Sequence, residues 1–274
     1  MIEFFQVLLR EEFLRNALFG ALLACVACGV VGPFVVVRRI GYIAGGISHS
    51  VLGGMGIALF LGGSPLIGAL AAALVAAVVI GFVTLRSRTN EDIVISALWS
   101  GGMAIGILFI ARTPGYNVNL MSYLFGNILM IPRDGLYHIA LLDLVIVGTV
   151  GVCYKYFVAV CFDEEFARLR GVPTDFFYLL LLGMVAITCV ILVQIVGLIL
   201  VIALLTLPAA IARGFVASLD RIVYLSVGIG CVVSSVGLVV AYQADLPAGA
   251  TIILLVTLLF FVLSGGRKIL RIFR

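Results

Sequence analysis

The chain has 274 residues, of which 64% are hydrophobic and 11% are charged, and its formal net charge is +4. A water-soluble domain is about half apolar and about a quarter charged, so this composition excludes a single soluble globular domain. Because a membrane-crossing helix needs about 20 apolar residues, the sequence predicts an all-α integral membrane protein, a polytopic bundle of about eight or nine transmembrane helices.

The first residues are more polar than most of the chain. They carry three glutamates beside Arg10 and Arg15, and their apolar residues recur at helical spacing. A cleaved signal peptide would begin with basic residues, which this segment lacks. We therefore expect an interfacial amphipathic helix at residues 1–16, within a single transmembrane domain that covers residues 1–274.

Nine long apolar runs follow in chain order, and each predicts one membrane crossing. They cover residues 17–37, 42–62, 65–85, 93–111, 136–154, 174–194, 195–212, 222–242 and 247–265. The stretch 117–131 is apolar but short and is closed by Pro132, which is typical of a half-helix or re-entrant segment. If the run 195–212 is half of a broken helix, the number of crossings falls to eight.

The basic residues distinguish the two sides of the membrane, because cytoplasmic loops carry an excess of Lys and Arg. When the loops are assigned to alternate sides, most of the 17 Lys and Arg residues, including Arg38 and Arg39, fall on one side. This side is predicted to be cytoplasmic, and it includes the C-terminus and the loop 161–175. With nine crossings, the N-terminal segment lies on the outer side.

The loop "CFDEEFARLRGVPTD", residues 161–175, concentrates charge in a chain that otherwise avoids it. It predicts a short cytoplasmic helix at 161–172, in which Glu164 and Arg168 pair one turn apart. The simpler interpretation is a solvated connector. A connector has no need for exposed apolar groups, so the Phe and Leu side chains favour a docking helix for a cytoplasmic partner. The candidate docking residues are Asp163, Glu164, Glu165, Phe166, Arg168, Leu169 and Gly171.

His49 lies inside an apolar run, where ionisable groups are rare and usually line a pathway or the bundle interior. Helical spacing places four glycines on its face, which lets another backbone approach closely or leaves an open groove. Neutral imidazole is the commonest side-chain ligand of transition metals, so His49 is a candidate metal ligand. The alternative is a histidine hydrogen-bonded between tightly packed helices. The candidate pathway residues are Gly45, Gly46, Ser48, Gly53 and Gly56.

Two other features inside apolar runs are interpreted as structural. Asp143 and His138 share the run 136–154, but their spacing does not align them on one helix face, so we expect Asp143 to bond to a neighbouring helix. Cys25 and Cys28 form a C-x-x-C without a second pair or a nearby histidine, and we interpret them as packing residues.

Four blocks of the sequence, in this order, resemble a known family. They are "GPFVVVRRIGYIAGGISHSVLGGMGIALFLG" (32–62), "NEDIVISALWSGGMAIGILF" (90–109), "SYLFGNIL" (122–129) and "VGLILVIALLTLPAAIA" (196–212). The family is that of the permeases of bacterial ATP-binding-cassette (ABC) importers for zinc, manganese and iron(II), the ZnuB and MntB type. The resemblance covers nearly the whole chain.

The resemblance implies a multi-pass protein of the bacterial cytoplasmic membrane that dimerises with itself or with a paralogue. Such a permease docks a cytoplasmic ABC ATPase dimer and receives its divalent cation from an extracytoplasmic metal-binding protein. The segment 161–172 is then the coupling helix, and His49 matches the histidine expected to meet the metal. Many members carry an aspartate where this chain has Gly45. This difference leaves His49 to act with its dimer mate, with water, or mainly as a gate.

The chain is expected to transport by alternating access and to perform no bond chemistry of its own. It contains no G-x-x-x-x-G-K-[ST] phosphate loop, so a separate subunit would use the ATP. We expect no cofactor bound by this chain and no nucleic-acid partner. The alternatives are an ion-coupled secondary transporter, which ordinarily needs several intramembrane carboxylates and repeated halves, and an intramembrane enzyme. A single imidazole does not distinguish zinc, manganese and iron(II).

Overall fold

The computed structural model describes residues 10–86, 91–113, 126, 128, 131–198 and 201–272, with side chains up to residue 265. Within these ranges every regular element is helical, and eight helices are long and apolar enough to cross a membrane. They are α2 (Glu12–Arg38), α3 (Gly41–Phe60), α4 (Pro65–Arg86), α5 (Glu91–Ala111), α7 (Arg133–Phe162), α9 (Thr174–Val196), α11 (Leu219–Ala244) and α12 (Ala248–Ile272). The predicted polytopic helical bundle is confirmed.

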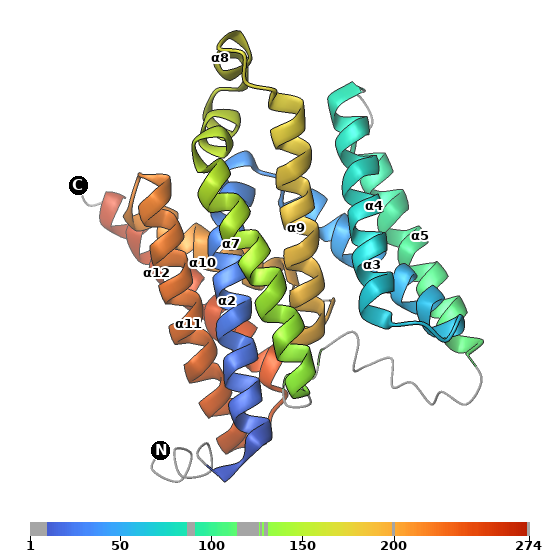
Figure 1. Cartoon of the computed structure of the whole chain (residues 1–274). Coiled ribbons are helices and arrows are strands. Elements are labelled where there is room, and N and C mark those ends of the chain that lie inside the picture. Colours follow the sequence, from blue (N-terminus) through green and yellow to red (C-terminus); the bar gives the residue numbers. More distant parts are fainter. Residues whose placement is uncertain are drawn as a thin grey trace.

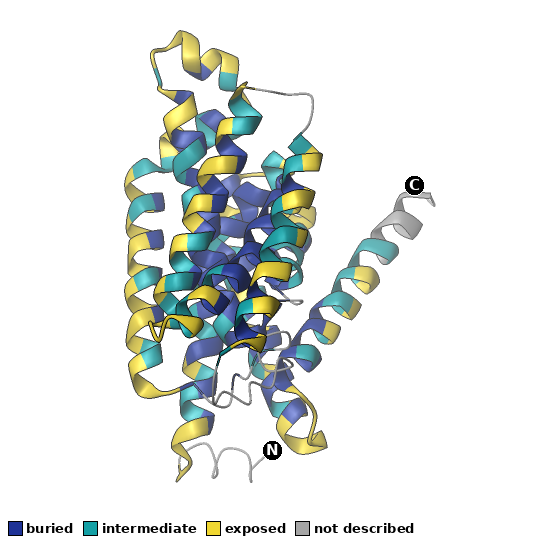
Figure 2. Cartoon of the chain, turned by 90° about the vertical axis from the view of Figure 1, so that its right-hand side faces the viewer, coloured by how far each residue is buried: buried dark blue, intermediate teal, exposed yellow. Residues whose placement is uncertain are grey.

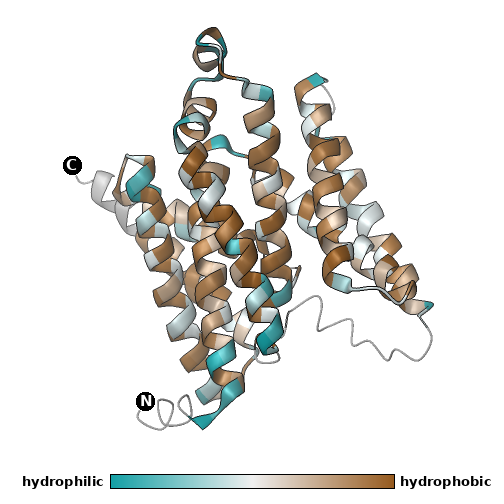
Figure 3. Cartoon of the chain, viewed as in Figure 1, coloured by the Kyte–Doolittle hydropathy of each residue, from teal (hydrophilic) through white to brown (hydrophobic). Residues whose placement is uncertain are grey.

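Two shorter helices complete the described structure, α8 (Glu164–Leu169) and α10 (Val201–Phe215). Figure 1 shows α8 projecting from one end of the bundle, whereas α2 begins at the opposite end. Helices α3, α4 and α5 stand together on one side, and the remaining long helices form the larger part. The bodies of the long helices are mostly hydrophobic, and hydrophilic residues gather near their ends (Figure 3). This distribution matches a bilayer, in which only apolar surface can face the lipid.

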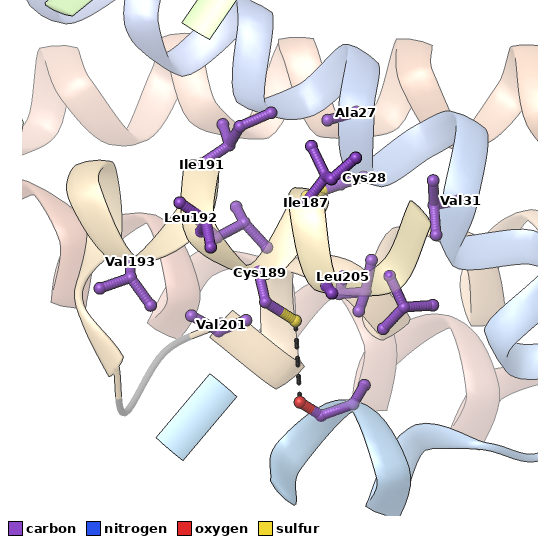
Figure 4. Packing of buried hydrophobic residues seen from close by; sticks show 14 of the residues in the cluster. Ala27, Cys28, Val31, Ile187, Cys189, Ile191, Leu192, Val193, Val201 and Leu205 are labelled. Carbon is purple, nitrogen blue, oxygen red and sulfur yellow. Dashed lines mark hydrogen bonds between the residues drawn. The ribbon is translucent and has the colours of Figure 1, made fainter. Parts of the chain in front are cut away.

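The centre of the bundle is formed by α2, α3 and α9, most of whose residues are buried, whereas α4, α5 and α7 present exposed apolar faces. Figure 2 shows buried residues gathered in the interior of the bundle and exposed residues on its outside. Figure 4 shows part of this centre, where side chains of α2, α9 and α10 interdigitate around Cys189. Small residues permit the close approach. A Cβ atom placed on Gly32 of α2 would lie 2.2 Å from the carbonyl oxygen of Leu205 in α10. Lipid tails are as apolar as leucine, so the hydrophobic effect does not drive membrane helices together. Close van der Waals packing of this kind stabilises their contact instead.

The apolar run 195–212 does not form one spanning helix. Helix α9 continues to Val196 and ends at Gly197, whose φ of +79° suits a residue without a side chain. Helix α10 begins at Val201 and has 15 residues. It is therefore about 22 Å long, which is shorter than the roughly 30 Å hydrocarbon core. The described residues thus match the alternative with eight full-length spans and one broken run.

Other boundaries also differ from those expected. Residues 12–16 belong to α2 rather than to a separate interfacial helix, and the first part of that predicted helix, 1–9, lies outside the described residues. The predicted re-entrant stretch 117–131 also lies mostly outside them. Helix α7 extends to Phe162, so the cytoplasmic helix begins later than the predicted residue 161. Membrane helices commonly continue beyond their apolar runs, because polar residues at their ends remain in contact with water.

Candidate functional site

His49 lies on α3 and is 7% exposed. Its imidazole ring stacks on the indole ring of Trp99 in α5, with 4.2 Å between the ring centroids and 14° between the planes. The Nδ1 atom of His49 is buried and has no hydrogen-bond partner among the described residues. Sequence reasoning missed Trp99, although it is the single tryptophan of the chain. The histidine is therefore tightly packed, as the structural alternative expected, but this nitrogen is not hydrogen-bonded.

The glycines on the His49 face of α3 bring this helix close to α5. A Cβ atom on Gly53 would lie 2.9 Å from the carbonyl oxygen of Gly102, and one on Gly56 would lie 2.6 Å from that of Gly106. The two glycines nearer the start of α3 contact larger side chains, which include Trp99 at Gly45 and Ile95 at Gly46. Of the two expectations for this face, close approach of another backbone and an open groove, the structure shows close approach within the chain.

Ser48 faces a different neighbour from His49, because successive helical residues are turned by about 100°. Its hydroxyl donates to the carbonyl oxygen of Ala44 at 2.7 Å and lies 3.1 Å from the sulfur of Cys189 in α9. The Cys189 thiol in turn lies 3.7 Å from the same carbonyl oxygen, as drawn in Figure 4. Ser48 therefore links α3 to α9, whereas its chain neighbour His49 contacts α5 through the stack on Trp99.

A metal bound at His49 needs further ligands. No group of three or more His, Cys, Asp or Glu side chains that could hold a metal ion occurs in the part of the chain that the structure describes. Zinc in proteins usually has about four ligands, and manganese commonly has about six. The imidazole can therefore supply one ligand, and the others must come from outside this constellation, for example from water or from a second copy of the chain.

Asp143 lies on the inward face of α7 and is 4% exposed. Neither oxygen of its carboxyl group has a hydrogen-bond partner among the described residues, so the expected bond to a neighbouring helix is not observed. His138 lies near the start of the same helix, where its Nδ1 atom is 2.7 Å from the carbonyl oxygen of Asp134. The structure does not bring these two side chains together with His49.

The predicted docking helix is present as α8. The carboxylate of Asp163 accepts a hydrogen bond from the backbone N–H of Phe166 at 2.9 Å, which caps the start of the helix. The expected pair of Glu164 and Arg168 is observed at 3.5 Å. Gly171 follows the helix with a φ of +79°, a conformation that favours glycine.

The apolar side chains of this segment are exposed at the end of the bundle. Leu169 is 87% exposed and Phe166 is 51% exposed, whereas Ala167 is the buried residue that anchors α8. Glu165 is exposed beside them. An exposed leucine and phenylalanine on a charged helix form a small surface suited to a protein partner.

A cluster of charged residues lies beneath α8. The carboxylate of Glu164 forms an ion pair with Arg38 at the end of α2, and Arg168 contacts the carboxylate of Asp175 at 2.6 Å. These residues border a cavity of about 500 Å³ between the ends of α2, α4, α5 and α9. Sequence reasoning placed Arg38 on the cytoplasmic side but did not identify its partner, because the two residues are 126 positions apart.

The described part of the chain has eight candidate spans, a buried histidine and a charged helix with exposed apolar residues at one end, which together define a polytopic helical membrane protein. The comparison with protein families gives the particular family. The chain matches the ABC 3 transport family over residues 10–265, and it belongs to this family. The resemblance found in the sequence is confirmed, and the chain is a multi-pass protein of the bacterial cytoplasmic membrane.

Several proteins resemble the chain over nearly its whole length. An uncharacterized membrane protein of Synechocystis is 40% identical, with 98% of this chain and 95% of that protein covered. The manganese transport system membrane protein MntC of Halalkalibacterium halodurans is 32% identical, with coverages of 94% and 88%. The solved structure of PsaBC from Streptococcus pneumoniae in complex with Fab has a TM-score of 0.88 at 31% identity and covers 96% of this chain and 95% of the other.

Proposed function

We propose that this chain is the membrane-spanning permease of an ABC importer that moves a divalent transition metal ion, zinc, manganese or iron(II), into the cytoplasm. The observation that carries the proposal is the family match over residues 10–265. A relative that is named for manganese transport, and that this chain matches over 88% of its length, supports it. A separate ATPase subunit uses the ATP, and an extracytoplasmic binding protein delivers the metal.

The transported ion meets His49 during its passage. The unpartnered Nδ1 atom supports this role, because a buried polar atom without a hydrogen bond is unfavourable by about 1–3 kcal/mol and needs a reason to persist. In this conformation Trp99 covers one face of the imidazole. The whole side chain is only 7% exposed, so access to its nitrogen atoms requires a displacement of the surrounding helices.

The alternating-access movement is expected to involve α3 and α5 as one unit. Their backbones approach closely at Gly53 and Gly56, and closely packed helices are expected to move together. His49 and Trp99 belong to this unit, so its movement carries the candidate ligand between outward-facing and inward-facing positions.

The permease acts as a dimer, with a second copy or a paralogue, and docks two ATPase subunits through α8. The exposed Phe166 and Leu169 supply the apolar part of each docking surface, and Asp163, Glu164, Glu165 and Arg168 supply its charges. Because each chain offers one candidate ligand, His49, a second chain would add a second imidazole to the same metal.

An ion-coupled secondary transporter is the second candidate. The observation that favours it is the buried, unpartnered carboxyl group of Asp143, because such groups serve as ion or proton sites in secondary carriers. Repeated halves, which many such carriers show, are not recognisable in the sequence.

The two candidates differ in their energy source. The chain is reconstituted into liposomes with its ATPase subunit, the metal-loaded binding protein is added, and uptake of manganese and zinc is measured with and without internal ATP. We expect uptake only with ATP and only with an ATPase subunit able to hydrolyse it. Uptake that persists with a hydrolysis-deficient ATPase subunit, and that follows an ion gradient, would show that the chain is a secondary carrier.

A further inference from the structure

The connection between α2 and α3 is short and fixed in shape. Helix α2 ends at Arg38, and Arg39 adopts a left-handed conformation with φ 60° and ψ 32°. The backbone N–H of Ile40 donates to the carbonyl oxygen of Val35 at 3.1 Å, which closes the turn. Helix α3 begins at the next residue. With two residues between the helices, a displacement at the end of α2 passes directly to α3, on which His49 lies about two turns further along.

Arg38 connects this corner to the docking helix. Its guanidinium group forms an ion pair with the carboxylate of Glu164, and both side chains are about three-quarters buried, with 23% and 28% exposed. The guanidinium carbon also lies 5.4 Å from the centroid of the Tyr178 ring in α9. A partly buried pair is less screened by water and salt than a pair on the open surface. The contact is therefore suited to transmit a displacement of α8.

Helix α8 has few other attachments. It has six residues, of which only Ala167 is buried. Its one basic side chain, Arg168, contacts Thr174 at 3.2 Å and Asp175 at 2.6 Å, both at the start of the helix that follows α8 in the chain. Helices α7 and α9 flank α8 in the chain. Among the described residues, one ion pair joins α8 to a helix other than these two, and it is the pair of Glu164 and Arg38.

We propose that Arg38 is a positioning residue that couples the ATPase-docking helix to the helix bearing His49, an inference that rests on the proposed function. When the ATPase displaces α8, the pair of Glu164 and Arg38 displaces the corner at Arg39 and, with it, α3. The cavity of about 500 Å³ beside the pair, lined by Thr84 and Glu91 among others, leaves room for the corner to move in an otherwise packed bundle.

The test is the number of metal ions transported for each ATP hydrolysed by the reconstituted complex. Replacing Arg38 by Gln keeps a polar side chain, although a shorter one, and removes the charge. We expect Arg38→Gln complexes to hydrolyse ATP while the metal-to-ATP ratio falls about fivefold or more, the lower end of typical coupling energies between two sites. Arg38→Lys, which retains the charge, should restore most of the ratio. A residue that only stabilises the fold would lower the yield of assembled complex and leave this ratio unchanged.

Arg39 provides a matched control. It adjoins Arg38, is exposed, and is also basic, so Arg39→Gln should keep the wild-type ratio. A double-mutant cycle tests the pair itself: Arg38→Gln combined with Glu164→Gln should lower the ratio no further than either single change. If Arg38→Gln does not assemble, Glu164→Gln carries the test, with the same expected fall in the ratio.

Several results would overturn the coupling role. They are an assembled Arg38→Gln or Glu164→Gln complex with the wild-type ratio, an equal fall in Arg39→Gln, or losses that multiply in the double variant. Absence of ATP-dependent uptake by the wild-type complex would overturn the proposed function, and the coupling role with it. The two failures are distinguishable, because the second appears in the wild-type complex and the first appears only in the variants.

Discussion

At the scale of single residues, the stacking of His49 on Trp99 determines how the imidazole can act. The ring is held face to face with the indole, which fixes the direction of the ring edge that carries the two nitrogen atoms. Its Nδ1 atom is buried and unpartnered in the described conformation. A ring that is oriented in advance but lacks a hydrogen bond at this nitrogen is suited to a transient contact with a passing ion.

The two histidines of the chain provide a direct test of this role. Replacing His49 by Ala should lower metal uptake about tenfold or more, because it removes the one imidazole in the proposed pathway. Uptake is measured in the reconstituted complex, and co-purification of the ATPase subunit checks assembly. His138→Ala, at the outer end of α7, should leave uptake unchanged. Wild-type uptake by an assembled His49→Ala complex would remove this residue from the pathway.

At the scale of elements, the contact between α3 and α5 depends on glycines that face each other. The backbone of one helix lies against that of the other at Gly53 and Gly102 and again at Gly56 and Gly106. The sequence predicted that the glycine face of α3 would allow a close backbone contact or an open groove, but it did not predict which helix would cover this face. Glycine permits a close contact with any neighbour, so the partner is decided by how all the helices fit together.

The glycine contact predicts a difference between two Gly→Ala changes. A Cβ atom at Gly56 would lie 2.6 Å from a backbone carbonyl oxygen, which cannot move as a flexible side chain can. Gly56→Ala should therefore lower the stability by about 1–3 kcal/mol, measured as a lower thermal unfolding temperature in detergent. At Gly148 an added Cβ atom would meet nothing within 4 Å beyond its chain neighbours and the backbone of its own helix, so Gly148→Ala should be neutral or slightly stabilising. Equal unfolding temperatures for the two variants would contradict the close contact.

At the scale of the whole molecule, the bundle has two chemically different ends. Helix α8 and the charged cluster beneath it lie at one end, and α2 begins at the other (Figure 1). The excess of Lys and Arg predicts that the end with α8 faces the cytoplasm. Asp134, in the first turn of α7 and exposed, precedes the apolar run 136–154 and lies at the opposite end of that helix from α8.

Cysteine labelling tests this orientation. A membrane-impermeant maleimide should label Asp134→Cys in intact cells, and it should label Leu169→Cys only in inverted membrane vesicles, because each position lies outside the apolar runs and on one side of the membrane. The wild-type chain, whose six cysteines are buried or half-buried, measures the background. Labelling of Leu169→Cys in intact cells would reverse the assigned orientation.

The sequence by itself determined the class of fold, the approximate positions of the long helices, the docking helix and the candidate histidine. It could do so because lipid requires continuous apolar helices, so a polar or charged residue within an apolar run, or a charged loop between runs, stands out in the sequence. The break at Gly197, the cover of His49 by Trp99 and the pair of Arg38 and Glu164 were decided only by the tertiary structure. These features depend on which residues, distant in the chain, lie at the same depth on facing helices, and no periodicity within one helix contains that information.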